Sequence, residues 1–187
     1  MSYVVNLDFL LTNLLSTLFP NNSFFNYFFS FFSLKGVFVI IWALIVLLLV
    51  FFEEKKNPGI SRKDLKFVFL FSMSFLLTFF LADILLKNIF MRPRPILDTK
   101  YFILNTFSCP RDFSFPSAHA ATAFAAATIL AYFDKKRRWF YYIIAVLISY
   151  SRIYLGCHYF LDVVAGTILG FVISKIILLT NKKYYGA

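Results

Sequence analysis

The chain has 187 residues, of which 60% are hydrophobic and only 15% charged, and it contains 27 phenylalanines. This leaves room for one domain, but there is too much apolar surface for the interior of a soluble domain, so the sequence predicts an integral membrane protein. The net charge of +10 does not indicate nucleic-acid binding, because the basic residues fall in short runs between apolar segments. The N-terminus lacks the basic run and cleavage site of a signal peptide, so residue 1 is expected to remain in the mature protein.

The first 34 residues contain two apolar stretches, 7–19 and 24–34, separated by a polar break at 20–23. Each stretch is shorter than the roughly 20 residues that a spanning helix needs. A single span through the break would leave backbone groups without hydrogen-bond partners in lipid. Two interfacial or re-entrant helices are therefore the preferred interpretation, with an additional span as the alternative.

Five further apolar stretches are predicted to span the membrane, at residues 36–52, 67–90, 117–133, 139–155 and 158–179. The connection 91–116 contains four prolines and cannot be one helix. The third stretch is rich in alanine, and Gly166 and Gly170 form a small-xxx-small face on the last one, which suits close packing of helices. The predicted fold class is an all-α polytopic membrane helical bundle with five to six transmembrane helices.

The basic residues predict the orientation of this bundle. If the spans alternate, 12 of the 19 lysines and arginines lie on one side, in the loop 53–66, the turn 134–138 and the C-terminal end. The positive-inside rule makes that side cytoplasmic and places the connection 91–116 outside. The other seven oppose the rule at the outer ends of spans, and binding an anion is the plainest reason; they are Lys35, Lys87, Arg92, Arg94, Lys100, Arg111 and Arg152.

Three polar clusters fall at this outer face. The first contains Arg94 and Lys87, which Asp83 can orient from one helical turn earlier. For Arg92 and Lys100 in the same region, the preferred interpretation is that the side chains extend to the lipid headgroups.

The second cluster, 116–119, opens the third span. A proline at the start of a helix is preorganised, and the free N–H groups there attract anions. Ser117 can add a hydroxyl group and His119 a proton donor. Ordinary helix capping by Ser117 is the alternative, and it is compatible with anion binding.

The third cluster contains Arg152, His158 and Asp162. His158 and Asp162 are four residues apart, so on a helix they would share one face, with the carboxylate holding one imidazole nitrogen. Arg152 lies across an expected turn at Gly156 and can bring a forked cation to an anion beside the imidazole. The alternative is that Arg152 and Asp162 pair to join two helix ends, while His158 is merely interfacial.

Together the clusters supply cations, two histidines, a carboxylate and a helix N-terminus, a combination that suits phosphate. The cations neutralise its oxygens, one imidazole attacks, and the other protonates the leaving group. Two histidines and an aspartate could instead indicate zinc. A zinc ion beside Lys87, Arg94 and Arg152 would meet strong repulsion, so neither a metal nor another cofactor is expected.

The order and spacing of the clusters form a recognisable pattern, carried by Lys87, Arg94 and Pro95; Pro116, Ser117, Ala118 and His119; and Ser151, Arg152, His158 and Asp162. It resembles the three-part signature of the type 2 phosphatidic acid phosphatase superfamily, which includes membrane lipid phosphatases and vanadium haloperoxidases. The resemblance spans residues 87–162. One departure is Ala118, where the family usually has glycine; alanine keeps the backbone N–H but adds a methyl group near the substrate.

The resemblance implies roles for these residues. His158 would be the nucleophile and form a phosphohistidine, Asp162 would orient it, and His119 would be the general acid. The phosphate would be held by Lys87, Arg94, Ser117, Ala118 and Arg152. Together with the apolar stretches and the basic residues, the resemblance gives an expected domain plan: interfacial or re-entrant helices at 1–34, a transmembrane phosphatase core at 35–180 and a cytoplasmic tail at 181–187.

The function implied is that of a metal-independent phosphatase of the bacterial cytoplasmic membrane, with its site facing the periplasm or cell exterior. The expected substrate is undecaprenyl diphosphate, and the alternatives are phosphatidylglycerophosphate, phosphatidic acid and lipid A phosphates. A rival from another class is a non-catalytic phospholipid-binding or transport protein. Apart from membrane lipids, no partner is expected, neither nucleic acid nor an obligate protein.

Two cysteines, Cys109 and Cys157, fall on the predicted outer side. An oxidising compartment permits a disulfide between them. Two free, buried cysteines are the preferred interpretation, because sequence does not reveal their separation in space.

Overall fold

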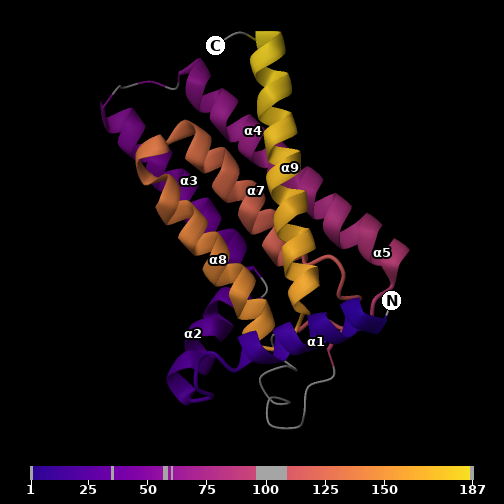
Figure 1. The fold of residues 1–187 in the computed structure, drawn as a ribbon. Helices are drawn as coiled ribbons and strands as arrows, with labels where there is room; N and C mark the ends of the chain where they lie inside the picture. Colours follow the sequence, from indigo (N-terminus) through magenta and orange to yellow (C-terminus); the bar gives the residue numbers. More distant parts are fainter. Residues whose placement is uncertain (1, 35, 57–58, 60, 96–108, 186–187) are drawn as a thin grey trace.

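The computed structural model describes residues 2–34, 36–56, 59, 61–95 and 109–185, and within these ranges all regular structure is helical (Figure 1). The predictions for Lys35 and Lys100 lie outside the described residues. The helices are α1 (Ser2–Ser16), α2 (Ser23–Ser33), α3 (Val37–Lys56), α4 (Arg62–Phe79), η1 (Phe80–Leu86), α5 (Lys87–Phe90), α7 (Ala118–Phe133), η3 (Lys135–Arg137), α8 (Arg138–Tyr154) and α9 (Phe160–Tyr185).

Three helical segments are long and apolar enough to cross a membrane: Val37–Lys55, the continuous rod Arg62–Phe90 formed by α4, η1 and α5, and Phe160–Asn181 in α9. Helices α7 and α8 run alongside them, with 16 and 17 residues respectively (Figure 1). The all-helical membrane bundle is therefore confirmed. Among the described residues, length and composition support three spans, whereas the predicted number was five to six.

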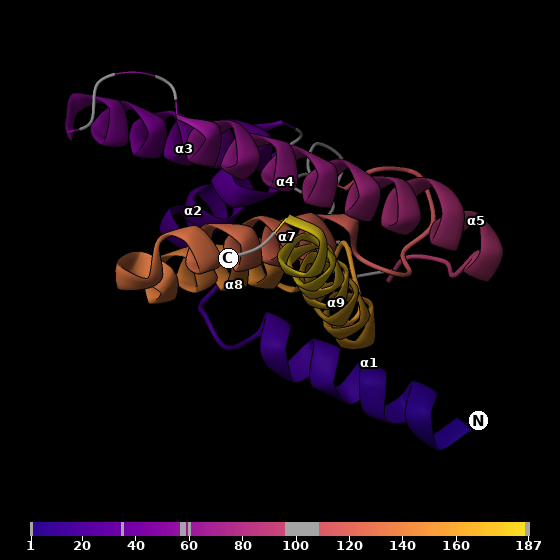
Figure 2. The same ribbon diagram turned by 90° about the horizontal axis from the view of Figure 1, so that it is seen from above.

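Helix α7 forms the centre of the bundle and packs against α4, α8 and α9 (Figure 2). Eleven of its 16 residues are buried, and most of these are alanines. Short side chains allow the neighbouring helices to approach closely, as helices do when lipid rather than water surrounds them. The residues at its N-terminal end are therefore held firmly in place.

The two glycines of α9 make the closest of these approaches. A Cβ atom on Gly170 would lie 1.9 Å from the carbonyl oxygen of Ala121 in α7, and one on Gly166 would lie 2.4 Å from that of Ser117. The predicted small-xxx-small face is therefore confirmed, and it lies against the start of α7.

Replacing Gly170 with alanine should force α9 away from α7, because the obstructing atoms belong to backbone and cannot turn aside. Overpacking of this kind costs about 1–3 kcal/mol, so we expect a clearly lower midpoint of thermal unfolding in detergent. The matched control is Ile168→Ala on the same helix, at a side chain that is 56% exposed. An equal loss of stability in the two variants would contradict a packing role specific to Gly170.

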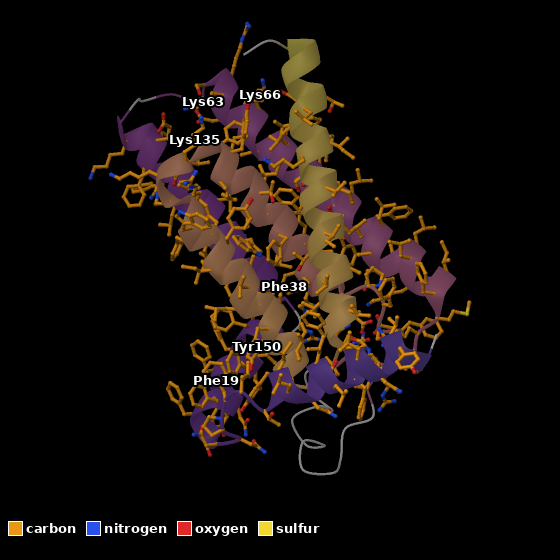
Figure 3. The ribbon with its side chains drawn as sticks, in the orientation of Figure 1. Phe19, Phe38, Lys63, Lys66, Lys135 and Tyr150 are labelled. Carbon is orange, nitrogen blue, oxygen red and sulfur yellow. A yellow bond between two sulfur atoms is a disulfide. The ribbon has the colours of Figure 1, made fainter. Side chains whose placement is uncertain are left out.

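The two ends of the bundle differ in character. Lys63, Lys66 and Lys135 lie at one end, and Phe19 and Tyr150 lie at the other (Figure 3). Helix α1 runs across this second end rather than along the bundle (Figures 1 and 2). The outer side of α1 carries exposed apolar side chains such as Leu10 and Leu14. This arrangement is compatible with interfacial N-terminal helices, which stay a prediction.

Candidate active site

The loop after α8 sets the position of His158. Gly156 adopts a φ of 67°, a left-handed conformation that favours glycine. The N–H of Gly156 donates to the carbonyl of Ile153, and the N–H of Cys157 donates to the carbonyl of Arg152. Both distances are 2.9 Å. This pair of bonds is a Schellman motif. The N–H of His158 also bonds the Arg152 carbonyl, at 3.1 Å, so the expected turn at Gly156 is confirmed.

His158 precedes α9 instead of lying within it. The prediction that His158 and Asp162 share one helical face is therefore wrong, because α9 begins at Phe160. The two side chains nevertheless meet, with His158 Nδ1 3.5 Å from Asp162 Oδ2. Asp162 lies in the first turn and reaches back to accept the N–H of Tyr159 at 2.9 Å, as the acidic residue of a capping box does.

Arg94 contacts the imidazole ring of His158. Arg94 Nη1 lies 3.1 Å from His158 Nε2, and a guanidinium group can only donate. The contact therefore favours the tautomer in which Nε2 accepts from Arg94 and Nδ1 carries the proton; Nδ1 lies 3.5 Å from Asp162 Oδ2 and has no hydrogen-bond partner among the described residues. Burial lowers the pKa of His158 well below its ordinary value, and the charge of Arg94 lowers it further. The ring is thus neutral at neutral pH and has the electronic form of a nucleophile.

Lys87 and Arg94 meet at a carboxylate that the sequence analysis missed. Asp112 Oδ2 lies 2.5 Å from Lys87 Nζ, and Asp112 Oδ1 lies 2.5 Å from Arg94 Nη2. Burial acts to raise the pKa of Asp112, but the hydrogen bonds from Lys87 and Arg94 hold it below its usual range. The expected contact between Asp83 and Lys87 is confirmed. Lys87 and Arg94 are therefore close enough for one anionic group, here the carboxylate of Asp112, to contact both.

The start of α7 carries the second cluster. Ser117 caps the helix by accepting the N–H of Ala120 at 3.5 Å, and its own N–H donates to the carbonyl of Asp162 at 2.9 Å. The Ser117 N–H is thus already engaged in joining α7 to α9. Ala118 packs in a buried cluster that includes Ala82 of η1. Nε2 of His119 is buried and has no hydrogen-bond partner within the described part of the chain.

These groups surround a cavity of about 310 Å³ between the start of α3, the C-terminal part of the α4–α5 rod and the start of α7. Its polar wall contains Lys87, Arg94, Asp112, His119 and His158. Its apolar wall contains Phe38, Val39 and Phe79. The cavity therefore places a neutral imidazole, a second imidazole and two cations beside an apolar surface, which suits an amphiphilic phosphate.

Residues 67–185 match the PAP2 superfamily over more than half of the chain. The chain belongs to the PAP2 superfamily. This confirms the relationship to membrane lipid phosphatases that the three motifs predict.

Two curated relatives and one solved structure illustrate the similarity. The undecaprenyl-diphosphatase of Sulfolobus acidocaldarius is 34% identical over 72% of this chain and 60% of its own length. The lipid A 4'-phosphatase of Bacteroides thetaiotaomicron is 31% identical over 80% of this chain and 67% of its own length. The crystal structure of Aquifex aeolicus LpxE superposes with a TM-score of 0.64 and 28% identity, covering 92% of this chain and 95% of that one.

Arg152 of the PAP2 motif is absent from the described lining of the cavity. Arg152 is fully buried, and its Nη1 donates to the carbonyl of Ser33, at 3.1 Å, and to the hydroxyl of Ser33. Arg152 is therefore part of the contact between α8 and the end of α2. It is not among the described residues that line the cavity, and its contact with phosphate stays a prediction.

The preferred interpretation of Arg92, which lies two residues before Arg94, is wrong. Its guanidinium does not extend to headgroups: Nη1 lies 2.7 Å from Asp162 Oδ1 and Nη2 lies 2.5 Å from Asp8 Oδ2. The guanidinium also stacks over Tyr159, 4.0 Å from the ring centroid. Paired carboxylates hold the cation here, and Asp8 is a further PAP2-site neighbour that sequence reasoning missed.

The preferred interpretation of the cysteines is also corrected. Cys109 and Cys157 form a disulfide across a sequence separation of 48, with their Cα atoms 5.2 Å apart. The fold brings together segments whose separation the sequence does not reveal. The bond joins the segment before α7 to the loop that carries His158, where the carbonyl of Cys157 accepts a hydrogen bond from Arg94 Nη1 at 2.7 Å.

Breaking this disulfide should loosen the placement of His158 and Arg94. Loss of a native disulfide typically costs about 2–5 kcal/mol, so dithiothreitol should lower both the thermal midpoint and the turnover of the purified protein. The control is Cys109→Ser, which should start at the lowered values and show no further response to the reductant. An equal response of both proteins would assign the effect to something other than this bond.

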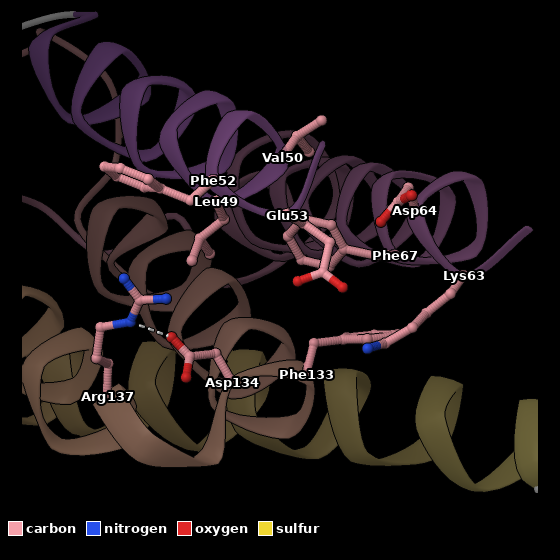
Figure 4. Close-up of a pocket in the computed structure, with 10 residues that line it drawn as sticks. All are labelled: Leu49, Val50, Phe52, Glu53, Lys63, Asp64, Phe67, Phe133, Asp134 and Arg137. Carbon is pink, nitrogen blue, oxygen red and sulfur yellow. Dashed lines mark hydrogen bonds and ion pairs between the residues drawn. The ribbon is translucent and has the colours of Figure 1, made fainter. Parts of the chain in front are cut away.

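A second cavity, of about 330 Å³, lies at the opposite, lysine-rich end of the bundle (Figures 3 and 4). Glu53, Lys63 and Asp64 line it with the ion pair Asp134–Arg137, whose atoms Oδ2 and Nε are 2.5 Å apart. Its described lining mixes charges of both signs and includes neither of the two histidines. The first cavity, which both histidines line, is therefore the candidate active site.

Proposed function

We propose that the chain is a membrane lipid phosphatase that acts through a phosphohistidine intermediate. The observation that carries the proposal is the position of His158. Its Nε2 lies 3.1 Å from Arg94 Nη1 in a cavity that Lys87 and His119 also line. A nucleophile next to fixed cations is the arrangement that phosphoryl transfer requires.

The proposed reaction has two steps. His158 Nε2 attacks phosphorus and forms a P–N bond. The bond from phosphorus to the leaving oxygen breaks, and His119 gives that oxygen a proton. Water then attacks phosphorus and forms a new P–O bond, with His119 accepting a proton from the water. The P–N bond breaks, its electron pair returns to His158 Nε2, and inorganic phosphate leaves. Lys87 and Arg94 neutralise the charge on the oxygens throughout.

A lipid substrate is favoured by the apolar side of the cavity. Val39 and Phe79 line the cavity, and their side chains are 42% and 37% exposed, respectively. A lipid chain can lie against these residues while its phosphate contacts Lys87 and Arg94. Undecaprenyl diphosphate is the first candidate, supported by the similarity to the Sulfolobus protein. Phosphatidylglycerophosphate, phosphatidic acid and lipid A phosphates are the alternatives.

The proposed sidedness places the cavity towards the outer face, because Phe38, which lines it, lies away from Lys63, Lys66 and Lys135 (Figure 3). We propose with it the division into interfacial N-terminal helices, a core at 35–180 and a cytoplasmic tail at 181–187. In intact cells, an impermeant thiol reagent should label cysteine introduced at Asn21 and spare cysteine introduced at Lys136. The reverse pattern would overturn the sidedness.

Phosphate release by the purified protein from a panel of detergent-solubilised lipid phosphates, ranked by kcat/KM, tests the activity and its substrate. We expect release to continue in EDTA, because Lys87 and Arg94 neutralise charge in place of a metal. Loss in EDTA with recovery on adding zinc or magnesium would overturn the metal-independent mechanism. Lipid binding without release would instead favour the binding or transport protein.

A further inference from the structure

Helix α1 is polar towards the protein and apolar on its outer side. Its buried residues Asp8, Thr12 and Ser16 are spaced by four, so they lie on one face. Asp8 is only 1% exposed. A buried carboxylate at a membrane boundary is costly unless it is paired and hydrogen-bonded. The burial of Asp8 therefore has to be offset by specific hydrogen bonds and ion pairs.

Two residues of α1 bind the start of α9. Thr12 Oγ1 accepts the N–H of Phe160 at 2.9 Å, and Asp8 Oδ1 accepts the N–H of Leu161 at 2.8 Å. Backbone N–H groups in the first turn have no partner within their own helix. Helix α1 thus caps α9 from outside, through one neutral residue and one charged residue.

The charged residue has a second contact. Asp8 Oδ2 lies 2.5 Å from Arg92 Nη2, and the same guanidinium reaches Asp162 through Nη1, at 2.7 Å. The other oxygen of Asp162 lies 3.5 Å from His158 Nδ1. Asp8, Arg92 and Asp162 therefore alternate in charge, and the series ends on His158, the proposed nucleophile.

We infer that Asp8 and Arg92 are positioning residues that set the basicity of His158 through Asp162. The catalytic meaning of this inference rests on the proposed function. Arg92 divides its charge between two carboxylates. Because Arg92 also pairs with Asp8, it neutralises the carboxylate of Asp162 only in part. The remaining negative charge of Asp162 stabilises the imidazolium form of His158.

The two positioning residues should then act in opposite directions. Without the charge of Asp8, Arg92 interacts with Asp162 alone, which weakens the support for a protonated His158 and lowers its pKa. Without the charge of Arg92, the carboxylate of Asp162 acts on His158 in full, which raises the pKa. If Asp8 and Arg92 only held α1 in place, their loss would not shift the pKa of His158 in opposite directions.

Other charged and titratable groups face His158 from the surrounding elements, and the variants leave all of them in place. They are Lys87 in α5, Arg94 and Asp112 in the connecting segments, His119 in α7, Arg152 in α8 and Asp162 in α9. Burial and the cations among them already lower the pKa of His158. A change caused by Asp8 or Arg92 is therefore measured against a constant background.

The chain contains two histidines, which makes a direct measurement feasible. Protein labelled with ¹⁵N-histidine should give two sets of imidazole signals, and the variant His119→Gln assigns them. We expect Asp8→Asn to lower the pKa of His158 relative to the native protein, and Arg92→Gln to raise it. The amide introduced by Asp8→Asn keeps an oxygen for the Leu161 N–H, so the cap is retained while the charge is lost.

The matched control is Thr12→Val, which removes the neutral cap and leaves the charges untouched. It should loosen α1 but leave the pKa of His158 unchanged. Arg92→Lys should restore the native pKa in part, because it keeps the charge. Turnover of Asp8→Asn and Arg92→Gln should fall about tenfold or more, as for other residues that orient a catalytic group, with KM little changed.

Shifts of the same sign in Asp8→Asn and Arg92→Gln, or no shift in either, would overturn the inference. So would a shift in Thr12→Val equal to that in Asp8→Asn. The titration needs no turnover, so it separates the two proposals. Opposite shifts in a protein that releases no phosphate would overturn the proposed function alone, and phosphate release without opposite shifts would overturn the positioning role alone.

Discussion

Alanine in place of His158 should abolish phosphate release from every substrate, by about 10⁴-fold or more, because the P–N bond has no other nucleophile to form with. The loss should be equally complete for lipids and for activated aryl esters. The native ring is neutral because burial lowers its pKa. Measurements of kcat/KM for the native protein should therefore show an acid limb at lower pH than an ordinary histidine would produce.

Circular dichroism and the thermal midpoint must first show that His158→Ala is folded, since the side chain is 1% exposed and contributes to packing. Mass spectrometry of the acid-quenched native protein should detect phosphate on the peptide that contains His158. Phosphate release by a folded His158→Ala protein would remove this residue from the chemical step. If another residue carried the phosphate instead, mass spectrometry of the acid-quenched variant would detect phosphate on a different peptide.

Alanine in place of His119 should instead produce a loss that depends on the leaving group. General acid catalysis is worth about 10²–10⁴-fold when the departing oxygen is a poor leaving group. Nε2 of His119 is buried and free of partners among the described residues, so it is available to a substrate oxygen. His119→Ala should therefore be severely impaired on the lipid but retain much of its turnover on a nitrophenyl phosphate with a lipid-like tail.

The comparison needs both variants on both substrates, with the native protein alongside. A burst of nitrophenol in His119→Ala would show that phosphohistidine forms and that its hydrolysis has become slow. Equal losses on the two substrates would contradict the leaving-group role. His119 would then act by positioning phosphate or by activating water, and solvent exchange into released phosphate would distinguish these roles.

Several parts of the site could be predicted because they are local in sequence. The glycine at 156 indicated a turn, and the structure shows the Schellman motif that holds His158 near Arg152. Asp83 and Lys87 are one helical turn apart and do meet. In each case a few residues and their backbone conformation determine the outcome. The exact start of α9 was not predictable, because Tyr159 and Asp162 form a cap that an apolar run does not reveal.

The amino-acid sequence by itself determined the membrane class, the helical content and the three motifs, since composition, apolar length and spacing are properties of consecutive residues. Only the tertiary structure decided that Asp112 joins the two cations and that Asp8 and Arg92 connect to Asp162. It also decided the pairing of Cys109 with Cys157. These contacts link distant segments, and the energies of such charged groups depend on burial and partners that exist only after the helices have packed.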